Sequence, residues 1–132
     1  MNFFKNTIVP ILLAGIWINL SEFFRNEVLI KQVWISHYEN MGLVFPAQAL
    51  NGIVWMIWGF LLAIAIFIVS KKYNLWQTTF LVWFIAFLML WVVMWNLLVL
   101  PSGILLYAVP LSFIEVFVAT LLCKWLFDKK MD

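Results

Sequence analysis

The sequence has very little charge: only 11% of its 132 residues are Asp, Glu, Lys or Arg, whereas 67% are hydrophobic. A soluble domain is typically about 25% charged and about 45–50% apolar, so this composition lies outside the soluble class. A chain of this size could not bury so much apolar surface in a core of its own. The composition therefore predicts one domain that is surrounded by membrane lipids.

Histidine and cysteine are also nearly absent. His37 is the single histidine and Cys123 the single cysteine, which excludes an intrachain disulfide, a histidine- or cysteine-rich metal site and bis-histidine haem. The sequence has no glycine-rich phosphate loop, and its lysines and arginines form no basic stripe for nucleic acid. We therefore expect no metal, no cofactor and no nucleic-acid partner.

The chain does contain four apolar stretches, each bounded by charged or turn-forming residues. They cover about 8–24, 47–69, 75–100 and a last stretch from 104 or 110 to 127. As a helix each covers about 25 Å or more, close to the thickness of the hydrocarbon core. Helices are expected rather than strands, because an isolated strand in lipid would leave its backbone polar groups unpaired. The predicted fold is all-α, a polytopic membrane protein with a four-transmembrane-helix bundle in a single domain of residues 1–132.

The distribution of lysine and arginine predicts the orientation. Arg25 and Lys31 lie on one side of the predicted spans, and the other side has Lys5, Lys71, Lys72, Lys124, Lys129 and Lys130. Because cytoplasmic loops carry the excess of positive charge, both termini are predicted to be cytoplasmic, in a cell (inner or plasma) membrane. The first apolar run passes into Glu22 and Arg25 without a small-residue cleavage site, so we expect an uncleaved span.

Two connections leave alternatives open. The outer loop, 25–46, has apolar residues at helical spacing, which favours either a short helix on the membrane surface or a continuation of the first span beyond the lipid. The fourth helix begins at either Ile104 or Pro110. We prefer Pro110, because proline is well tolerated in the first turn of a helix and bends a helix that it interrupts.

A faint internal repeat relates the two halves of the chain. In each half a polar residue follows a proline by five positions, and a further asparagine precedes both: Asn19, Pro46 and Asn51, then Asn96, Pro110 and Glu115. This pattern predicts two pseudo-repeated helical hairpins of the same orientation.

Polar residues inside the spans are the candidates for function, because a charge at the centre of a span costs about 2.5–3.5 kcal/mol on insertion scales. The predicted ligand-binding set consists of such residues and of tryptophans beside them: Asn19, Glu22, Asn51, Trp55, Trp95, Asn96, Ser112 and Glu115. Measured from the predicted outer boundaries, most of the polar members lie roughly 7–9 Å deep. The inner half is apolar, so we expect a polar pocket that opens outward.

The two glutamates carry most weight in this set. Asparagines in membranes often only bond across helices, whereas an intramembrane carboxylate is a functional candidate by default. Arg25 follows Glu22 by three residues and is expected to reach it. No lysine or arginine is predicted at the depth of Glu115, so this residue is expected either to be protonated or to bind a cation.

Three functions follow from these residues. The first is a protein whose outward pocket binds or transports a small ligand, cation or proton; a transport pathway would need a homodimer or a larger membrane complex. The second is a membrane enzyme acting on a lipid or isoprenoid, with Glu22 and Glu115 as acid and base. The third is an accessory subunit that packs against a partner through tryptophans and a strip of small residues, namely Gly52, Gly59 and Ala63.

Overall fold

The computed structural model describes residues 2–128, and these residues form helices, turns and loops without any strand. Four helical segments in this range are long and apolar enough to cross a membrane: Phe4–Leu29, Ala49–Ser70, Leu75–Asn96 and Leu105–Leu126. The predicted all-α bundle with four spans is confirmed, and the architecture is that of a small multi-pass membrane protein. Two lysines used for the orientation, Lys129 and Lys130, lie outside the described residues.

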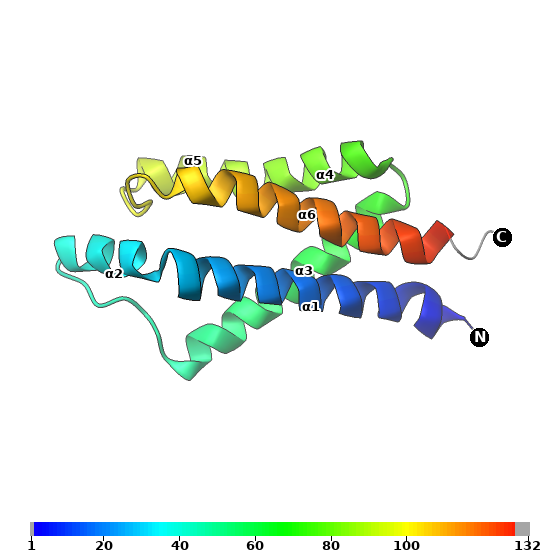
Figure 1. The fold of residues 1–132 in the computed structure, drawn as a ribbon, viewed down its shortest axis with the longest axis horizontal. Coiled ribbons are helices and arrows are strands. Elements are labelled where there is room, and N and C mark those ends of the chain that lie inside the picture. Colours follow the sequence, from blue (N-terminus) through cyan, green and yellow to red (C-terminus); the bar gives the residue numbers. More distant parts are fainter. Residues whose placement is uncertain (1, 129–132) are drawn as a thin grey trace.

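The first span consists of three continuous helical pieces. A π-helical turn, η1 (Phe4–Ile8), leads into α1 (Val9–Phe23), which continues into a second π-helical turn, η2 (Phe24–Leu29). The helix is interrupted at Ile30, and α2 (Lys31–Asn40) then runs on in nearly the same direction (Figure 1). Of the two alternatives for the outer loop, the structure agrees with a helix that continues beyond the first span.

The remaining spans form the rest of the bundle. They are α3 (Ala49–Ser70), then α4 (Leu75–Trp83) joined by the π-helical turn η3 (Phe84–Leu88) to α5 (Met89–Asn96), and finally α6 (Leu105–Asp128). Figure 1 shows both chain ends and the α3–α4 turn at one end of the bundle, which we call the terminal end. The α2–α3 connection and the α5–α6 turn lie at the opposite end, the loop end. Both termini thus share one side, as an even number of spans requires.

The fourth helix begins at Leu105, so our preference for a start at Pro110 was wrong. Ile104 and Ala108 are buried, and the amide nitrogen of Ala108 donates to the carbonyl of Ile104 at 2.9 Å. Packing of this apolar face stabilises the first turn. Pro110 removes only the hydrogen bond to the carbonyl of Leu106, so the proline does not prevent the helix from starting before it.

Two glycines set the close approach of α1 and α3. The ring of Phe60 occupies the position that a Cβ on Gly15 would take, and the amide of Asn19 lies 2.7 Å from the corresponding position on Gly59. Each glycine therefore accommodates a side chain of the other helix. Of the small-residue strip, Gly59 thus contacts α1, whereas Gly52 has nothing within 4 Å.

The buried core lies mainly between α1, α3 and α6, and small and branched side chains dominate it: Ala14, Ile18, Leu62, Ala63, Ile66, Val116, Ala119 and Cys123. Lys124 closes this core at the terminal end. Its Nζ donates at 2.9 Å to the carbonyl of Ser70, the last residue of α3. The carbonyls at a helix C-terminus lack intrahelical partners and carry partial negative charge, so a cation satisfies an open acceptor there.

Candidate functional site

Three charged side chains are buried together inside the bundle. Glu22 of α1, Arg25 of η2 and Glu115 of α6 are only 6%, 5% and 1% exposed. Arg25 lies between the two carboxylates: its Nη2 donates to Glu22 Oε1, and its Nη1 donates to Glu115 Oε2 at 3.0 Å. We refer to these three residues as the Glu–Arg–Glu cluster.

The helix geometry near Arg25 is unusual. The amide nitrogen of Ile30 donates to the carbonyl of Arg25, five residues earlier, at 3.0 Å, which is the wider hydrogen-bond pattern of η2. Such π-helical turns are frequent at functional sites. A second one, η3, supplies Phe87, whose ring centroid lies 5.6 Å from the guanidinium carbon of Arg25. At this distance the ring face attracts a cation, so two π-helical turns meet at the same guanidinium.

Neighbouring polar groups hold Glu22 by its carboxylate and Glu115 by its backbone. Asn26 Nδ2 donates to Glu22 Oε2 at 2.9 Å, and Trp34 Nε1 of α2 donates to Asn26 Oδ1 at 3.3 Å. Trp17 Nε1 donates to the main-chain carbonyl of Glu115 at 2.9 Å. Glu22 is therefore held from the loop end, and Glu115 is bound to the first span through both its side chain and its backbone.

One oxygen of the cluster has no hydrogen-bond partner. Among the described residues, the buried side-chain polar atoms without a partner are Glu115 Oε1 and Asn6 Oδ1. An unsatisfied buried polar atom is costly, and in a native protein it calls for an explanation. The charges of the cluster explain the free oxygen of Glu115. With both carboxylates ionised, a single guanidinium leaves the cluster with a net charge of −1. The cluster can therefore accept one further positive charge, and Glu115 Oε1 is the free atom to accept it.

Two expectations about Glu115 are wrong. A cation does lie at its depth, because the first span extends to Leu29 instead of ending at Phe24 and therefore includes Arg25. The depth itself also differs. Since α6 begins at Leu105, Glu115 lies about 15 Å along the helix from its first residue, farther than the expected depth of roughly 7–9 Å.

The hydrogen bonds of Asn19 and Asn51 go to groups outside the cluster. Asn19 Nδ2 donates to the carbonyls of Gly15 at 2.9 Å and Met56 at 3.4 Å, so this side chain joins α1 to α3. Asn51 Oδ1 accepts from the amide nitrogen of Gln48 at 2.9 Å and caps the start of α3. Asn96 is exposed at the last position of α5. The structure thus gives two of the three asparagines roles in helix packing and capping.

The remaining predicted residues also have other surroundings. Trp55 and Trp95 are 52% and 70% exposed on the outside of the bundle. Ser112 is buried, and its Oγ accepts from Trp83 Nε1 at 2.9 Å and donates to the carbonyl of Val109 at 3.1 Å. Ser112 therefore joins α6 to α4, whereas Glu115, one turn further, joins α6 to the first span.

The proposed repeat does not extend to the roles of its residues. Pro46 precedes α3 in the connecting loop, whereas Pro110 lies within α6. Asn51 is a capping residue, whereas Glu115 is part of a buried ion-pair cluster.

Several members of the site were not in the predicted ligand-binding set: Trp17, Arg25 as a partner of Glu115, Asn26 and Phe87. The sequence was compatible with a longer first span, because the apolar residues 28–30 lie three to five positions after Arg25. The contacts of the aromatic residues have no comparable signal, since they depend on how the helices are rotated against each other.

The described residues contain no group of three His, Cys, Asp or Glu side chains placed to hold a metal ion. Comparisons of the chain with protein-family models, curated proteins and solved structures found no match. The Glu–Arg–Glu cluster is the candidate functional site of this chain.

Proposed function

We propose that the protein binds a single proton at the Glu–Arg–Glu cluster and is a proton-coupled binding or transport protein. The observation that carries this proposal is that one guanidinium serves two buried carboxylates and leaves Glu115 Oε1 without a partner. A charge near the centre of a span costs about 2.5–3.5 kcal/mol on insertion scales, so a proton that cancels the net charge of −1 is bound favourably. Carboxylates inside the membrane commonly serve as proton relays in pumps and transporters.

Burial favours a proton over other cations. Glu115 is 1% exposed and Glu22 6%, so neither carboxylate faces a space that a hydrated ion would fill. A proton needs no coordination shell and binds to one oxygen. The charged groups that act on Glu115 are Glu22 and Arg25, both from the first span, so the proton binds where that span meets α6.

The other two functions have less support. An enzyme acting on a lipid or isoprenoid would need Glu22 or Glu115 to reach its substrate, but both are closed off and bound to the same guanidinium. The accessory-subunit hypothesis used the small-residue strip as a surface for a partner. Gly59 instead accommodates Asn19 within the chain.

Infrared spectroscopy of the reconstituted protein tests the proposal. A protonated carboxylic acid in a dry site has a distinct carbonyl stretching band that is slow to exchange with deuterium. We expect one such band in the wild type, lost at alkaline pH and absent from Glu115→Gln. The matched control is Glu39→Gln, because Glu39 is an exposed carboxylate at the loop end and its substitution should leave the slowly exchanging band unchanged.

Two results would contradict the proposal. A spectrum of Glu115→Gln identical to that of the wild type at every pH would show that Glu115 holds no proton. A band lost in Glu22→Gln but retained in Glu115→Gln would place the proton on the other carboxylate. For transport, proteoliposomes with an internal pH-sensitive dye should dissipate a pH gradient faster with the wild type than with Glu115→Gln, and equal rates would exclude a pathway through this residue.

A further inference from the structure

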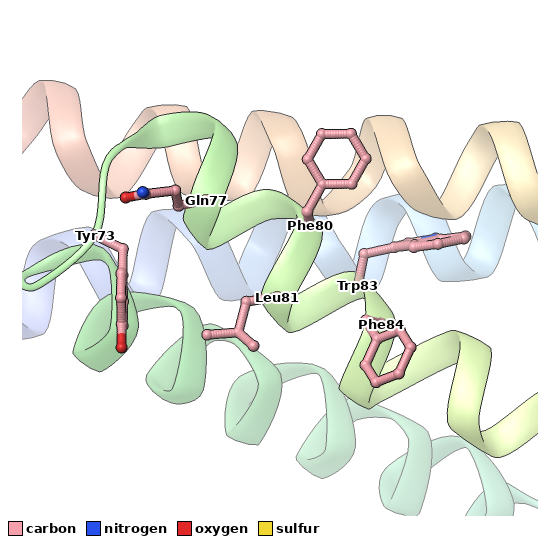
Figure 2. Close-up of a pocket in the computed structure, with 6 residues that line it drawn as sticks. All are labelled: Tyr73, Gln77, Phe80, Leu81, Trp83 and Phe84. Carbon is pink, nitrogen blue, oxygen red and sulfur yellow. The ribbon is translucent and has the colours of Figure 1, made fainter.

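A shallow groove lies on the outside of the bundle, away from the Glu–Arg–Glu cluster. It has a volume of about 530 Å³ and is lined by Tyr73, Gln77, Phe80, Leu81, Trp83 and Phe84. Figure 2 shows that it follows α4, with Phe80 directed toward α6 and Leu81 toward α3. From Gln77 to Trp83 the helix rises about 9 Å, roughly a third of the hydrocarbon core. The groove therefore runs from the terminal end into the apolar part of the span.

The two ends of this groove differ in chemistry. Its walls along α4 are aromatic and aliphatic, whereas its mouth at the terminal end has the hydroxyl of Tyr73 and the side-chain amide of Gln77. Two exposed lysines, Lys71 and Lys72, directly precede Tyr73 in the turn at this end of the groove. Lys72 Nζ lies 5.8 Å from the ring centroid of Tyr73, and Lys71 Nζ lies 4.3 Å from that of Phe67.

We propose that this groove binds one anionic phospholipid. Lys71 and Lys72 attract its phosphate, Tyr73 and Gln77 donate hydrogen bonds to it, and part of an acyl chain lies against the apolar wall. Basic residues next to a span recognise anionic headgroups, and each contributes through charge. A zwitterionic lipid offers the same acyl chain without the net negative charge, so charge complementarity selects the anionic class. The site is independent of the proposed proton binding, because it shares no residue with the Glu–Arg–Glu cluster.

Lipid titration followed by native mass spectrometry of the detergent-solubilised protein tests this site. Phosphatidylglycerol and phosphatidylcholine with identical acyl chains are added in separate titrations. We expect phosphatidylglycerol to bind more tightly to the wild type. The double variant Lys71→Gln/Lys72→Gln should weaken its binding about 30-fold, which corresponds to about 2 kcal/mol for two lysines near an anionic group, and leave phosphatidylcholine unaffected. The control is Lys31→Gln, which removes a lysine from the loop end.

A second pair of variants tests the groove itself. Leu81→Trp fills the groove, and Leu61→Trp places the same bulk on an exposed position of α3 outside it. We expect only Leu81→Trp to reduce binding of phosphatidylglycerol, while both variants keep the helix content of the wild type by circular dichroism. Equal binding of the two lipids, or no effect of the lysine variant, would refute recognition by charge. No effect of Leu81→Trp, or an equal effect of Leu61→Trp, would refute the groove as the binding site.

Discussion

Replacing Arg25 should damage this protein far more than replacing Glu115, the carboxylate that it contacts across the bundle. Arg25→Gln leaves Glu22 and Glu115 buried and facing each other without a cation. Removing one partner of a buried ion pair costs about 3–5 kcal/mol, because the remaining charge is uncompensated. At alkaline pH, where Glu115 has lost the proposed proton, two ionised carboxylates lose the same partner, so we expect the free energy of unfolding to fall by about 4–5 kcal/mol, toward the upper end of this range.

Glu115→Gln changes the charge of the cluster in the opposite sense. It removes the excess negative charge and leaves one glutamate, Glu22, paired with one guanidinium. The amide oxygen of the new glutamine can still accept from Arg25 Nη1, which lies 3.0 Å from Glu115 Oε2. We therefore expect the free energy of unfolding to change by no more than about 1 kcal/mol. A difference of about 3 kcal/mol or more between the two variants is the signature of one cation shared by two carboxylates.

Unfolding in mixed micelles of a mild detergent and dodecyl sulfate, followed by circular dichroism, measures these differences. The triple variant Glu22→Gln/Arg25→Met/Glu115→Gln should recover most of the stability lost in Arg25→Gln, because a whole buried ion-pair cluster can often be replaced by neutral groups without loss. The control is Lys31→Gln at the half-exposed Lys31–Glu27 pair, where we expect a change of about 1 kcal/mol at most. A loss below about 1 kcal/mol for Arg25→Gln, or equal losses for Arg25→Gln and Glu115→Gln, would refute the reasoning.

Two further predictions concern residues outside the cluster. Gly15→Ala should lower the free energy of unfolding by about 1–3 kcal/mol in the same assay, because the ring of Phe60 must move from the position of the new Cβ. The control Gly52→Ala, with nothing within 4 Å of the new Cβ, should change it by less than about 1 kcal/mol. Equal effects of the two substitutions would argue against the close α1–α3 contact. Asn51→Ala should lower the free energy of unfolding by about 1 kcal/mol, because the hydrogen bond from the amide nitrogen of Gln48 is lost. This substitution should leave the slowly exchanging infrared band unchanged. Loss of that band would show that Asn51 belongs to the proton site.

The four spans could be predicted because long apolar runs have one solution in lipid, and the helices at Ala49–Ser70 and Leu75–Asn96 lie close to their predicted ranges. The ends of the first span could not be predicted in this way. A charged residue ordinarily marks the boundary of a span, so Arg25 appeared to lie outside the membrane. In the structure its charge is compensated by two carboxylates, one of which is on the last helix. A partner 90 residues away leaves no local pattern around Arg25.

The depth of Glu115 along its helix was the second property that the sequence could not predict. Our estimate for Glu115 depended on where α6 begins, and the preference for proline in a first turn favoured Pro110. Tertiary burial of Ile104 and Ala108 decided the start instead. Asn51, in the first turn of α3, shows the same limit. A polar residue near a span boundary can either face the interior or cap the helix, and only the backbone geometry distinguishes the two.

The buried polar groups fall into two classes, and this separation strengthens the case for Glu115. Three buried hydroxyls donate to carbonyls of their own helices: Thr79 to Leu75 at 2.8 Å, Thr120 to Val116 at 2.7 Å and Ser70 to Phe67 at 2.8 Å. Their donors are satisfied locally, and they are neutral. The Glu–Arg–Glu cluster differs from these hydroxyls because it is charged and has a free acceptor.

The position of the cluster also indicates which contact a bound proton would change. When Glu115 is ionised, a charge-assisted hydrogen bond joins it to Arg25, and such bonds are roughly twice as strong as neutral ones. A proton on Glu115 would weaken this contact between the first span and α6, while the hydrogen bond from Trp17 to the backbone of Glu115 would remain. Under the proposed function, coupling between proton binding and movement should therefore occur as a shift of the first span against α6 about Trp17. The contact of α1 with α3, which depends on Gly15 and Gly59, should stay unchanged.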